Sequence, residues 1–362
     1  MSSNIGRYIK MQIFGESHGK AIGVVIDGIP HGIKLDMDAI AVQMTRRAPG
    51  NDKTSTPRKE ADIPEIISGV LNGVTTGAPL CAMIVNSNTR SRDYSNLVDT
   101  PRPSHADYPA NIRFNGYNDL SGSGHFSGRL TAPMVFAGAV CRQILKEKGI
   151  TVGGHIYSIG KVKDTPFDMV NVDENMLNGL NCRAFSVIDE KSEKEMRDVI
   201  EKARMDRDSI GGVCEVAVTG IDAGNGDVMF GSVESRISEA LFGVPAVKGV
   251  EFGAGFDISK MRGSEANDCY YIKDGKIATK SNNNGGILGG LTNGMPIIVR
   301  AALKPTPSIS KEQKTLNTKT LSDDTLIING RHDPCVVGRA LPVIESMVCF
   351  ILCDILKGNG KI

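Results

Sequence analysis

Residues 8–26 read YIKMQIFGESHGKAIGVVI, with the polar pentapeptide Gly15-Glu16-Ser17-His18-Gly19 at their centre. The flanking runs, Tyr8–Phe14 and Ala21–Ile26, predict two strands joined by this pentapeptide. A turn between strands carries polar side chains out of the sheet, and its glycines can adopt backbone angles that other residues avoid. Such a turn is either a simple connection or a place for chemistry, and the rest of the chain must decide between the two.

The composition is that of a globular protein with a sizeable core. The chain has 362 residues, 40% of them hydrophobic, and a mean hydropathy of −0.13. It lacks an apolar run of about 18 residues, and its N-terminus lacks a basic region followed by an apolar stretch. We therefore expect no membrane span and a cytoplasmic location.

The charge balance argues against nucleic acid as a partner. Lys and Arg number 42 and Asp and Glu 41, which gives a formal charge of +1, so any functional cations must be clustered locally. Eight cysteines show no C-x2-C pair and no histidines at metal-ligand spacing, which predicts buried thiols and no metal site. The cysteines are Cys81, Cys141, Cys182, Cys214, Cys269, Cys335, Cys349 and Cys353.

Hydrophobic periodicity predicts alternating strands and helices without a linker or repeat, and therefore one continuous α+β domain over residues 1–362. Residues 150–188 are expected to form short extended pieces with turns. The expected helices begin near Asp36, as N-cap, and run to Arg47, then span Ala132–Lys148, Asp189–Asp208, Val233–Phe242 and Gly338–Leu356. The expected strands beyond residue 26 are Ile66–Val70, Leu80–Val85, Val213–Thr219, Val247–Phe252, Asp268–Lys276 and Pro296–Leu303.

Three segments are predicted to be loops, the second of them functional and the third able to bind an anion. Residues 51–62 are polar, and residues 86–105 are long, irregular and rich in arginine. Ser121–Thr131 is a Gly/Ser loop that opens a helix and could offer backbone N–H groups to an anion. Its spacing matches neither a Walker A loop nor a dinucleotide fingerprint.

Histidines and arginines share the loops in a pattern that suggests proton transfer around a bound anion. His18, His105 and His332 lie among Arg, Ser or Asp, and Asp333 follows directly after His332. Imidazoles can act as acid or base near neutral pH, whereas guanidinium groups bind phosphate and carboxylate through paired donors. For Arg46 and Arg47 an alternative is a cationic last helical turn that complements the helix dipole.

Six motifs in order along the chain resemble chorismate synthase, and the resemblance covers essentially the whole chain. Any one of the motifs alone would be weak evidence, but their shared order and spacing make coincidence implausible. The motifs are Gly15–Gly19, Arg102–Tyr108, Ser127–Arg129, Asn284–Gly290, Leu303–Thr306 and Arg331–Cys335.

The resemblance implies a fold, a reaction and an assembly. The fold would be a β-α-β sandwich in which antiparallel sheets enclose a helical layer, and the assembly a homotetramer. The reaction would be the 1,4-anti elimination of phosphate from 5-enolpyruvylshikimate 3-phosphate to give chorismate, the last step of the shikimate pathway, which requires reduced FMN. The substrate carries a phosphomonoester of roughly −1.5 to −2 and two carboxylates, so a dry site needs on the order of four cations.

The resemblance also implies residue roles. His18 would protonate the leaving phosphate, His105 would protonate or polarise the reduced flavin, and Asp333 would assist proton removal from it. Ser17 and Ser127 would support the flavin and a proton relay. The substrate-binding positions would be Arg46, Arg47, Arg102, Arg129 and Arg331. The flavin-binding positions would be His125, Phe126, Ser127, Pro245, Ala246, Gly285, Lys304, Pro305, Thr306, Pro307, Ser308 and Arg331.

Positions Arg47 and Lys53 match those linked with NADP in the family. The chain shows no obvious extra domain or insertion, so we expect NADPH to act only indirectly, through an external flavin reductase. Two rival hypotheses are a regulatory anion-binding module that has lost turnover and a metal-dependent phosphatase.

The chain departs from the family pattern at several positions. Many members have Arg-Ser-Ser-Ala-Arg-Glu where this chain has His125-Phe126-Ser127-Gly128-Arg129-Leu130. Ser104 stands where glycine is common, and Lys53 where arginine is common. These departures concern the details of flavin binding, because His18, His105, Arg129 and Asp333 are all present.

Overall fold

The structure is a computed structural model that describes residues 3–50, 62–86, 99–328 and 332–362. Two predicted site residues, Lys53 and Arg331, lie outside the described residues. So do most of the polar loop 51–62 and most of the irregular stretch 86–105.

The opening stretch forms the hairpin that its pattern predicts. Strands β2 (Lys10–Gly15) and β3 (Ala21–Asp27) pair antiparallel, with Lys10 opposite Asp27 and Gly15 opposite Ile22. Alternate residues of β2, Met11 and Ile13, are buried, as expected for a sheet with one covered face. The full order of this first sheet is β1 (Asn4–Ile5), β2, β3, β7 (Leu80–Val85) and β4 (Glu65–Ser68).

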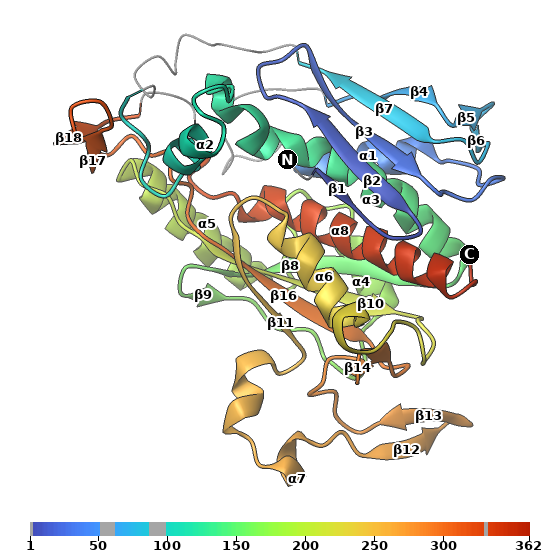
Figure 1. Ribbon diagram of the computed structural model, residues 1–362. Helices are drawn as coiled ribbons and strands as arrows, with labels where there is room; N and C mark the ends of the chain where they lie inside the picture. The colour runs from blue at the N-terminus through green and yellow to red at the C-terminus, as the bar shows by residue number, and fades with distance from the viewer. Residues whose placement is uncertain (1–2, 51–61, 87–98, 329–331) are drawn as a thin grey trace.

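A second five-stranded antiparallel sheet lies on the other side of the molecule (Figure 1). Its central strands, β10 (Gly212–Thr219) and β16 (Ile297–Leu303), are largely buried, which agrees with the apolar runs in the sequence. The order is β11 (Val247–Phe252), β16, β10, β8 (Thr151–Ile159) and β9 (Val162–Lys163).

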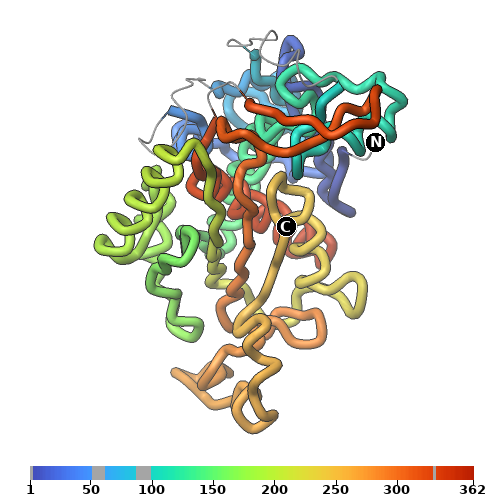
Figure 2. The backbone as a smooth tube through the Cα atoms, turned by 90° about the vertical axis from the view of Figure 1, so that its left-hand side faces the viewer, coloured from blue at the N-terminus to red at the C-terminus, as the bar shows by residue number. Residues whose placement is uncertain are grey.

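Long apolar helices fill the space between the two sheets. Helix α3 (Thr131–Glu147) contacts β2, β3 and β7, while α8 (Val337–Gly358) contacts β8 and β10, and the two helices pack on each other. Helices α1 (Met37–Arg47) and α6 (Val233–Phe242) flank this pair. The α+β class and the expected β-α-β sandwich are confirmed, and Figures 1 and 2 show the helical layer between the sheets.

The contact between α3 and α8 is unusually close at one point. A Cβ atom added to Gly138 would lie 2.1 Å from the Cβ of Ser346, so only glycine allows this helix spacing. Phe136 and Phe350 are fully buried in the same layer. Each such side chain stabilises the fold by about 1.5–3 kcal/mol relative to exposure.

Most predicted elements are present, and the exceptions are informative. The Asp36 carboxylate accepts a hydrogen bond from the Ala39 N–H at 3.0 Å and caps α1 as predicted. The prediction for residues 150–188 was wrong, because β8 is one strand of nine residues and a helix, α4 (Glu174–Leu180), follows. The hairpin β17 (Gln313–Asn317) and β18 (Ser322–Leu326) was not predicted.

The remaining elements are short or peripheral. They are β5 (Val70–Leu71), β6 (Val74–Thr75), α2 (Asp107–Arg113), η2 (Ser121–Phe126), η3 (Gly128–Leu130), α5 (Glu190–Met205), η4 (Met229–Gly231), η5 (Gly255–Lys260), α7 (Gly263–Ala266), β12 (Tyr270–Lys273), β13 (Lys276–Thr279), β14 (Ile287–Leu288) and β15 (Leu291–Thr292).

Among the described helices, none combines the length and the apolar character that crossing a bilayer requires.

The cysteines are all free thiols, but they are not all buried as predicted. Cys182 and Cys269 are exposed, and Cys81 is half-buried. The other five are buried, and burial raises the pKa of Cys335 and of Cys349 to about 12.

A buried charge cluster lies on and beside the second sheet. His155 on β8 is fully buried, with Nδ1 at 2.7 Å from Asp164 and Nε2 at 2.8 Å from Glu215. Arg300 on β16 donates to the second oxygen of Glu215 at 2.8 Å. Burial alone would lower the pKa of His155, but the hydrogen bonds to Asp164 and Glu215 outweigh it and raise the pKa above 6.5.

We expect His155→Gln to lower the free energy of unfolding by about 3 kcal/mol at about pH 6, because Asp164 loses a cationic partner inside the protein. A histidine whose pKa is raised in the folded state stabilises the fold fully at pH values below its unfolded-state pKa. This stabilisation is lost as the pH rises through the folded-state pKa. Urea unfolding at about pH 6 and about pH 9 should show a gap between wild type and variant that narrows at the higher pH. His31→Gln, at an exposed histidine, is the control. A gap of constant size would contradict this account.

Candidate active site

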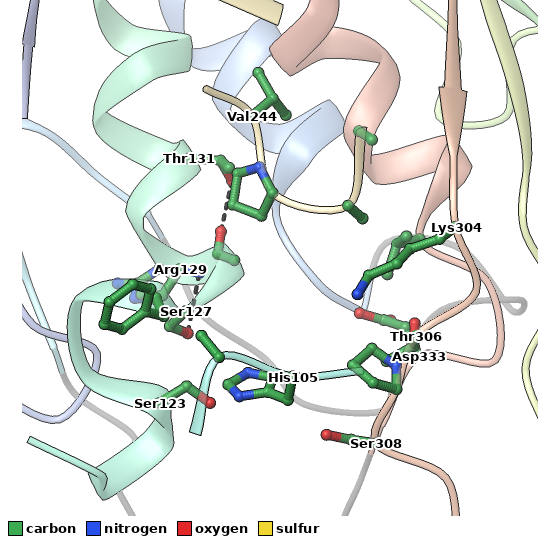
Figure 3. A pocket seen from close by; sticks show the side chains of 18 of the residues that line it. His105, Ser123, Ser127, Arg129, Thr131, Val244, Lys304, Thr306, Ser308 and Asp333 are labelled. Atoms are coloured by element: carbon green, nitrogen blue, oxygen red, sulfur yellow. Dashed lines mark hydrogen bonds between the residues drawn. The ribbon is translucent and has the colours of Figure 1, made fainter. Parts of the chain in front are cut away.

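A pocket of about 630 Å³ opens where segments far apart in the sequence converge. One wall is formed by the loop before α2, by η2 and η3, and by the start of α3. The other is formed by residues 242–248, the turn after β16 and the start of α8. Figure 3 shows Ser123, Ser127 and Arg129 on the first side, Lys304, Thr306 and Ser308 on the second, and His105 between them.

Two long helices direct their N-terminal ends at this pocket. Thr131 begins α3, and Arg339 and Ala340 belong to the first turn of α8, and all three line the pocket. The N-terminus of a helix carries partial positive charge and free N–H groups. The loop 121–131, which is predicted to bind an anion at the start of α3, therefore lies at the same pocket as the N-terminus of a second helix, α8, from a distant part of the chain.

The turn Gly15–Gly19 is held against η2 by backbone contacts. The Ser17 N–H donates to the Gly124 carbonyl at 3.1 Å, and His125 Nδ1 donates to the Gly15 carbonyl at 2.8 Å. The other ring nitrogen of His125 accepts from the Ser3 hydroxyl at 2.8 Å. His125 thus lines the pocket, but both of its ring nitrogens have protein partners.

Gly122 lies where the turn and η2 approach each other most closely. Its φ is +59°, and an added Cβ would lie 2.5 Å from His18 Cδ2 and 2.9 Å from Ser17 Oγ. Ser17 itself lines the pocket with 2% of its surface exposed, and His18 lies directly behind Gly122. The glycine is therefore required for the position of both side chains.

His105 is part of a cluster at the start of α2. Its Nδ1 lies 2.6 Å from Asp107 Oδ1 and 3.0 Å from Arg102 Nη2. Arg102 can only donate hydrogen bonds, whereas the ionised Asp107 can only accept them. The Nδ1 atom of His105 therefore carries a hydrogen and donates it in a hydrogen bond to Asp107. The remaining nitrogen, Nε2, is then the one available for chemistry in the pocket.

Asp107 also orients Arg102 by a bidentate ion pair. The Arg102 Nε and Nη2 atoms each donate to one carboxylate oxygen at 2.7 Å, and Nη1 donates to Ser308 Oγ at 3.1 Å. Burial alone would raise the pKa of Asp107, but its hydrogen bonds with Arg102 and His105 outweigh it and hold the pKa far below its usual range. Arg102 is therefore fixed in place by a carboxylate that neutralises much of its charge.

Arg47 and Arg129 share a second buried carboxylate. Arg47 Nη1 donates to one oxygen of Asp62, and Arg129 Nη1 donates to the other. Both arginines line the pocket, whereas Asp62 lies behind them. Burial would raise the pKa of Asp62, but the two guanidinium groups lower it.

The opposite wall combines an apolar turn with polar side chains. Pro245 and Ala246 line the pocket, and Ala246 adopts a φ of +73°, which an alanine rarely does. Lys304 donates to the carbonyl of Ser104, and burial, with a smaller contribution from Lys248, lowers the pKa of Lys304. Asp333 also lines the pocket and is ion-paired with Arg339.

The structure brings most of the predicted residues to this one pocket. His18 borders it only through Gly122. The predicted residues that line it are Ser17, Arg47, Arg102, His105, His125, Phe126, Ser127, Arg129, Pro245, Ala246, Lys304, Thr306, Pro307, Ser308 and Asp333.

Four predicted residues among the described ones do not line the pocket: His18, which packs against Gly122, and Arg46, Gly285 and Pro305. Arg46 makes a buried ion pair with Glu345 of α8 at 2.7 Å, so it joins two helices. Gly285 has a φ of +64°, and an added Cβ would lie 2.4 Å from the Gly253 nitrogen, so it permits a backbone-to-backbone contact and not an approach to a ligand. Pro305 is likewise absent from the lining.

Several residues of the site escape prediction from the sequence. Asp107 lies inside a predicted motif, two residues after His105, and that spacing could have suggested a partner for the imidazole. Asp62 and Gly122 carry no such signal, because their roles depend on segments far away in the chain. Within the described residues, no group of three or more His, Cys, Asp and Glu side chains could hold a metal ion.

Fold and site together are those of an enzyme with a pocket for a small molecule, lined by histidine, carboxylate and cationic side chains. Six cationic side chains line the pocket against one acid, Asp333. The cationic residues are Arg47, Arg102, Arg129, Lys248, Lys304 and Arg339. His105 and Asp333, whose side chains are of types that can exchange protons, lie among them.

Comparison with known proteins identifies the family. A family model described as chorismate synthase matches residues 9–356. A chorismate synthase of Thermococcus kodakarensis is 44% identical over 352 residues, 96% of this chain and 96% of that protein. One from Dehalococcoides mccartyi is 42% identical over 363 residues, covering 100% of this chain and 98% of that protein.

A solved structure agrees with these relatives. The crystal structure of a chorismate synthase has a TM-score of 0.77 to this chain at 29% identity, covering 98% of this chain and 93% of that one. The chain belongs to the chorismate synthase family. It is accordingly a carbon–oxygen lyase of the shikimate pathway that acts on a small-molecule substrate.

We expect Gly122→Ala to lower turnover by about 10²-fold, because a methyl group there displaces His18 and Ser17 and strains a left-handed backbone. Steady-state kinetics with a melting temperature for each variant separates this effect from unfolding. Gly179→Ala, in α4 where an added Cβ meets no atom within 4 Å, is the matched control. Normal turnover in Gly122→Ala would show that the position of His18 and Ser17 does not depend on this glycine.

Proposed function

We propose that this chain converts 5-enolpyruvylshikimate 3-phosphate to chorismate by 1,4-anti elimination of phosphate, in the presence of reduced FMN. The observation that carries the proposal is the pocket itself, in which six cationic side chains and two helix N-termini surround His105 and Asp333. Its volume of about 630 Å³ is within the usual range for small-molecule sites.

The charge of the pocket suits a substrate with three anionic groups. Arg47 and Arg129 lie together on one wall, beside the N-terminus of α3. Arg339 extends from the first turn of α8, and Lys304 lies on the second wall. Fixed guanidinium groups would bind the phosphate and carboxylates in the ground state and stabilise the additional charge on phosphate as it departs.

The proton transfers are assigned to three side chains. His18 would hold the proton that the leaving phosphate takes up. His105, with Nδ1 bound to Asp107, would present Nε2 to the pocket and hold a proton there. Asp333, which is ion-paired with Arg339, would accept a proton, and the hydroxyls of Ser17 and Ser127 would relay protons between these groups.

The described residues fit a flavin mononucleotide. Val244, Pro245 and Ala246 offer an apolar surface for the face of a ring, and Phe126 is 38% exposed at the opposite wall. Thr306 Oγ1 is buried at the pocket wall without a hydrogen-bond partner among the described residues, and Lys304 next to it supplies charge for an anionic group. Reduced FMN, when bound, supplies electron density for the elimination without net redox change.

We propose that the active form is a homotetramer in the cytoplasm. We also propose that an external flavin reductase provides the reduced flavin, with NADPH as the indirect source of electrons. The single-domain organisation over residues 1–362 belongs to the same proposal, and its support is that both sheets, α3 and α8 contribute residues to one core cluster.

The direct test is product formation under anaerobic conditions. Wild-type protein with reduced FMN and 5-enolpyruvylshikimate 3-phosphate should release phosphate and chorismate in equal amounts, and oxidised FMN should support neither. Phosphate release without flavin, abolished by a chelator, would indicate a metal-dependent phosphatase. No release under any of these conditions would indicate an anion-binding module.

We expect His105→Ala and Asp333→Ala each to lower turnover by about 10²-fold or more, with only a modest loss of substrate binding. The reason is that each removes a group that holds a proton at the reaction centre, while the arginines that bind the anions remain. Single-turnover rates and substrate titrations measure the two quantities separately. An unchanged turnover rate in either variant would show that the replaced residue does not take part in proton transfer.

A further inference from the structure

Asp62 is a buried acid whose two described partners, Arg47 and Arg129, both line the pocket. Its side chain is fully buried, and each carboxylate oxygen accepts from a different arginine, Oδ2 from Arg47 and Oδ1 from Arg129. Asp62 itself does not line the pocket. It can therefore affect a ligand only through the two guanidinium groups.

We propose that Asp62 is a positioning residue of the active site, whose carboxylate sets the spacing and orientation of Arg47 and Arg129 so that both bind the anionic groups of one substrate molecule. This inference rests on the proposed function. It assigns a role to a residue that touches neither substrate nor cofactor.

Each arginine has further fixed contacts, so that Asp62 completes a rigid arrangement. Arg47 Nε donates to Thr131 Oγ1 at 3.1 Å, and its Nη2 donates to the Gly128 carbonyl at 3.2 Å. Arg129 Nε donates to Asn86 Oδ1 at 3.0 Å. Because a guanidinium is planar, contacts at two or more of its nitrogens fix both its position and its plane.

The backbone of Asp62 supports a specific role. Its φ is +47°, in the left-handed region that residues other than Gly, Asn and Asp rarely adopt. The short side chain then reaches between α1, which carries Arg47, and the loop that carries Arg129. Asn can occupy the same conformation with the same shape, so Asp62→Asn changes the charge with little change in geometry.

Two other roles for Asp62 predict different outcomes. If Asp62 only stabilised the fold, its replacement would lower stability without a specific effect on the substrate. If Asp62 competed with the substrate for the arginines, its replacement would tighten substrate binding. The positioning role alone predicts weaker binding, because without the carboxylate between them the two guanidinium groups repel each other and move away from the spacing that suits one substrate molecule.

Glu345 provides a matched control for the loss of a buried carboxylate. It is fully buried and also bridges two arginines, Arg46 at 2.7 Å and Arg142 at 2.8 Å, but it does not line the pocket. Glu345→Gln should lower the melting temperature and leave the KM for substrate unchanged.

The experiment compares wild type, Asp62→Asn and Glu345→Gln by steady-state kinetics and by calorimetric titration with substrate and with inorganic phosphate. We expect Asp62→Asn to raise KM and both dissociation constants by about 10- to 100-fold, with kcat within a few-fold of wild type. Binding constants for Asp62→Asn equal to or tighter than those of wild type would overturn the proposal. The phosphate titration does not need turnover. An inactive wild type would therefore contradict the proposed function, whereas the effect of Asp62→Asn on phosphate binding would still test this inference.

A rescue experiment distinguishes lost charge from lost folding. Asp62→Ala leaves a space between the two guanidinium groups that formate can occupy as a carboxylate, whereas formamide has the same size and no charge. Formate should lower the KM of Asp62→Ala and not that of wild type, and formamide should have no effect. Equal effects of both additives, or no effect of formate, would overturn the positioning role.

Discussion

The packing of α3 on α8 is the constraint on which the rest of the structure depends. Gly138 lets the two helices approach until Ser346 fills the space that any larger residue would need. The two sheets can then cover opposite sides of one helical layer, and the N-termini of both helices lie at the pocket. A core feature with no chemistry of its own thus determines where two partial positive charges meet.

The cations of the site are held in place by carboxylates that do not line the pocket. Asp107 binds Arg102 through both oxygens and orients His105, and Asp62 joins Arg47 to Arg129. Each buried acid reduces the net positive charge of the pocket, so simple counting of arginines overstates its electrostatic attraction. In return, the guanidinium groups lose little freedom when the substrate binds, and fixed donors are more effective than mobile ones in stabilising a departing anion.

How far the sequence predicted this structure depends on the range of the interactions involved. Local signals worked: the cap at Asp36, the hairpin around Gly15–Gly19 and the apolar helices follow from periodicity and turn chemistry. Most predicted site residues do line one pocket, because they were predicted from the order of the six motifs along the chain. Arg46 does not line the pocket although its neighbour Arg47 has the same local context, because Arg46 pairs with Glu345 on a distant helix. Helix α4 was missed because residues 150–188 have a mixed pattern that tertiary packing resolves.

The departure at His125 shows why a family position and a residue role must be kept apart. Where many relatives have arginine, His125 donates to the Gly15 carbonyl and accepts from Ser3, so it joins η2 to the turn that carries Ser17 and His18. An imidazole with both nitrogens engaged is a poor ligand for a flavin, yet it fixes the same turn on which the proposed proton donor depends. His125 therefore connects two segments of the pocket wall, while Lys304, Arg339 and the N-termini of α3 and α8 supply positive charge to the pocket.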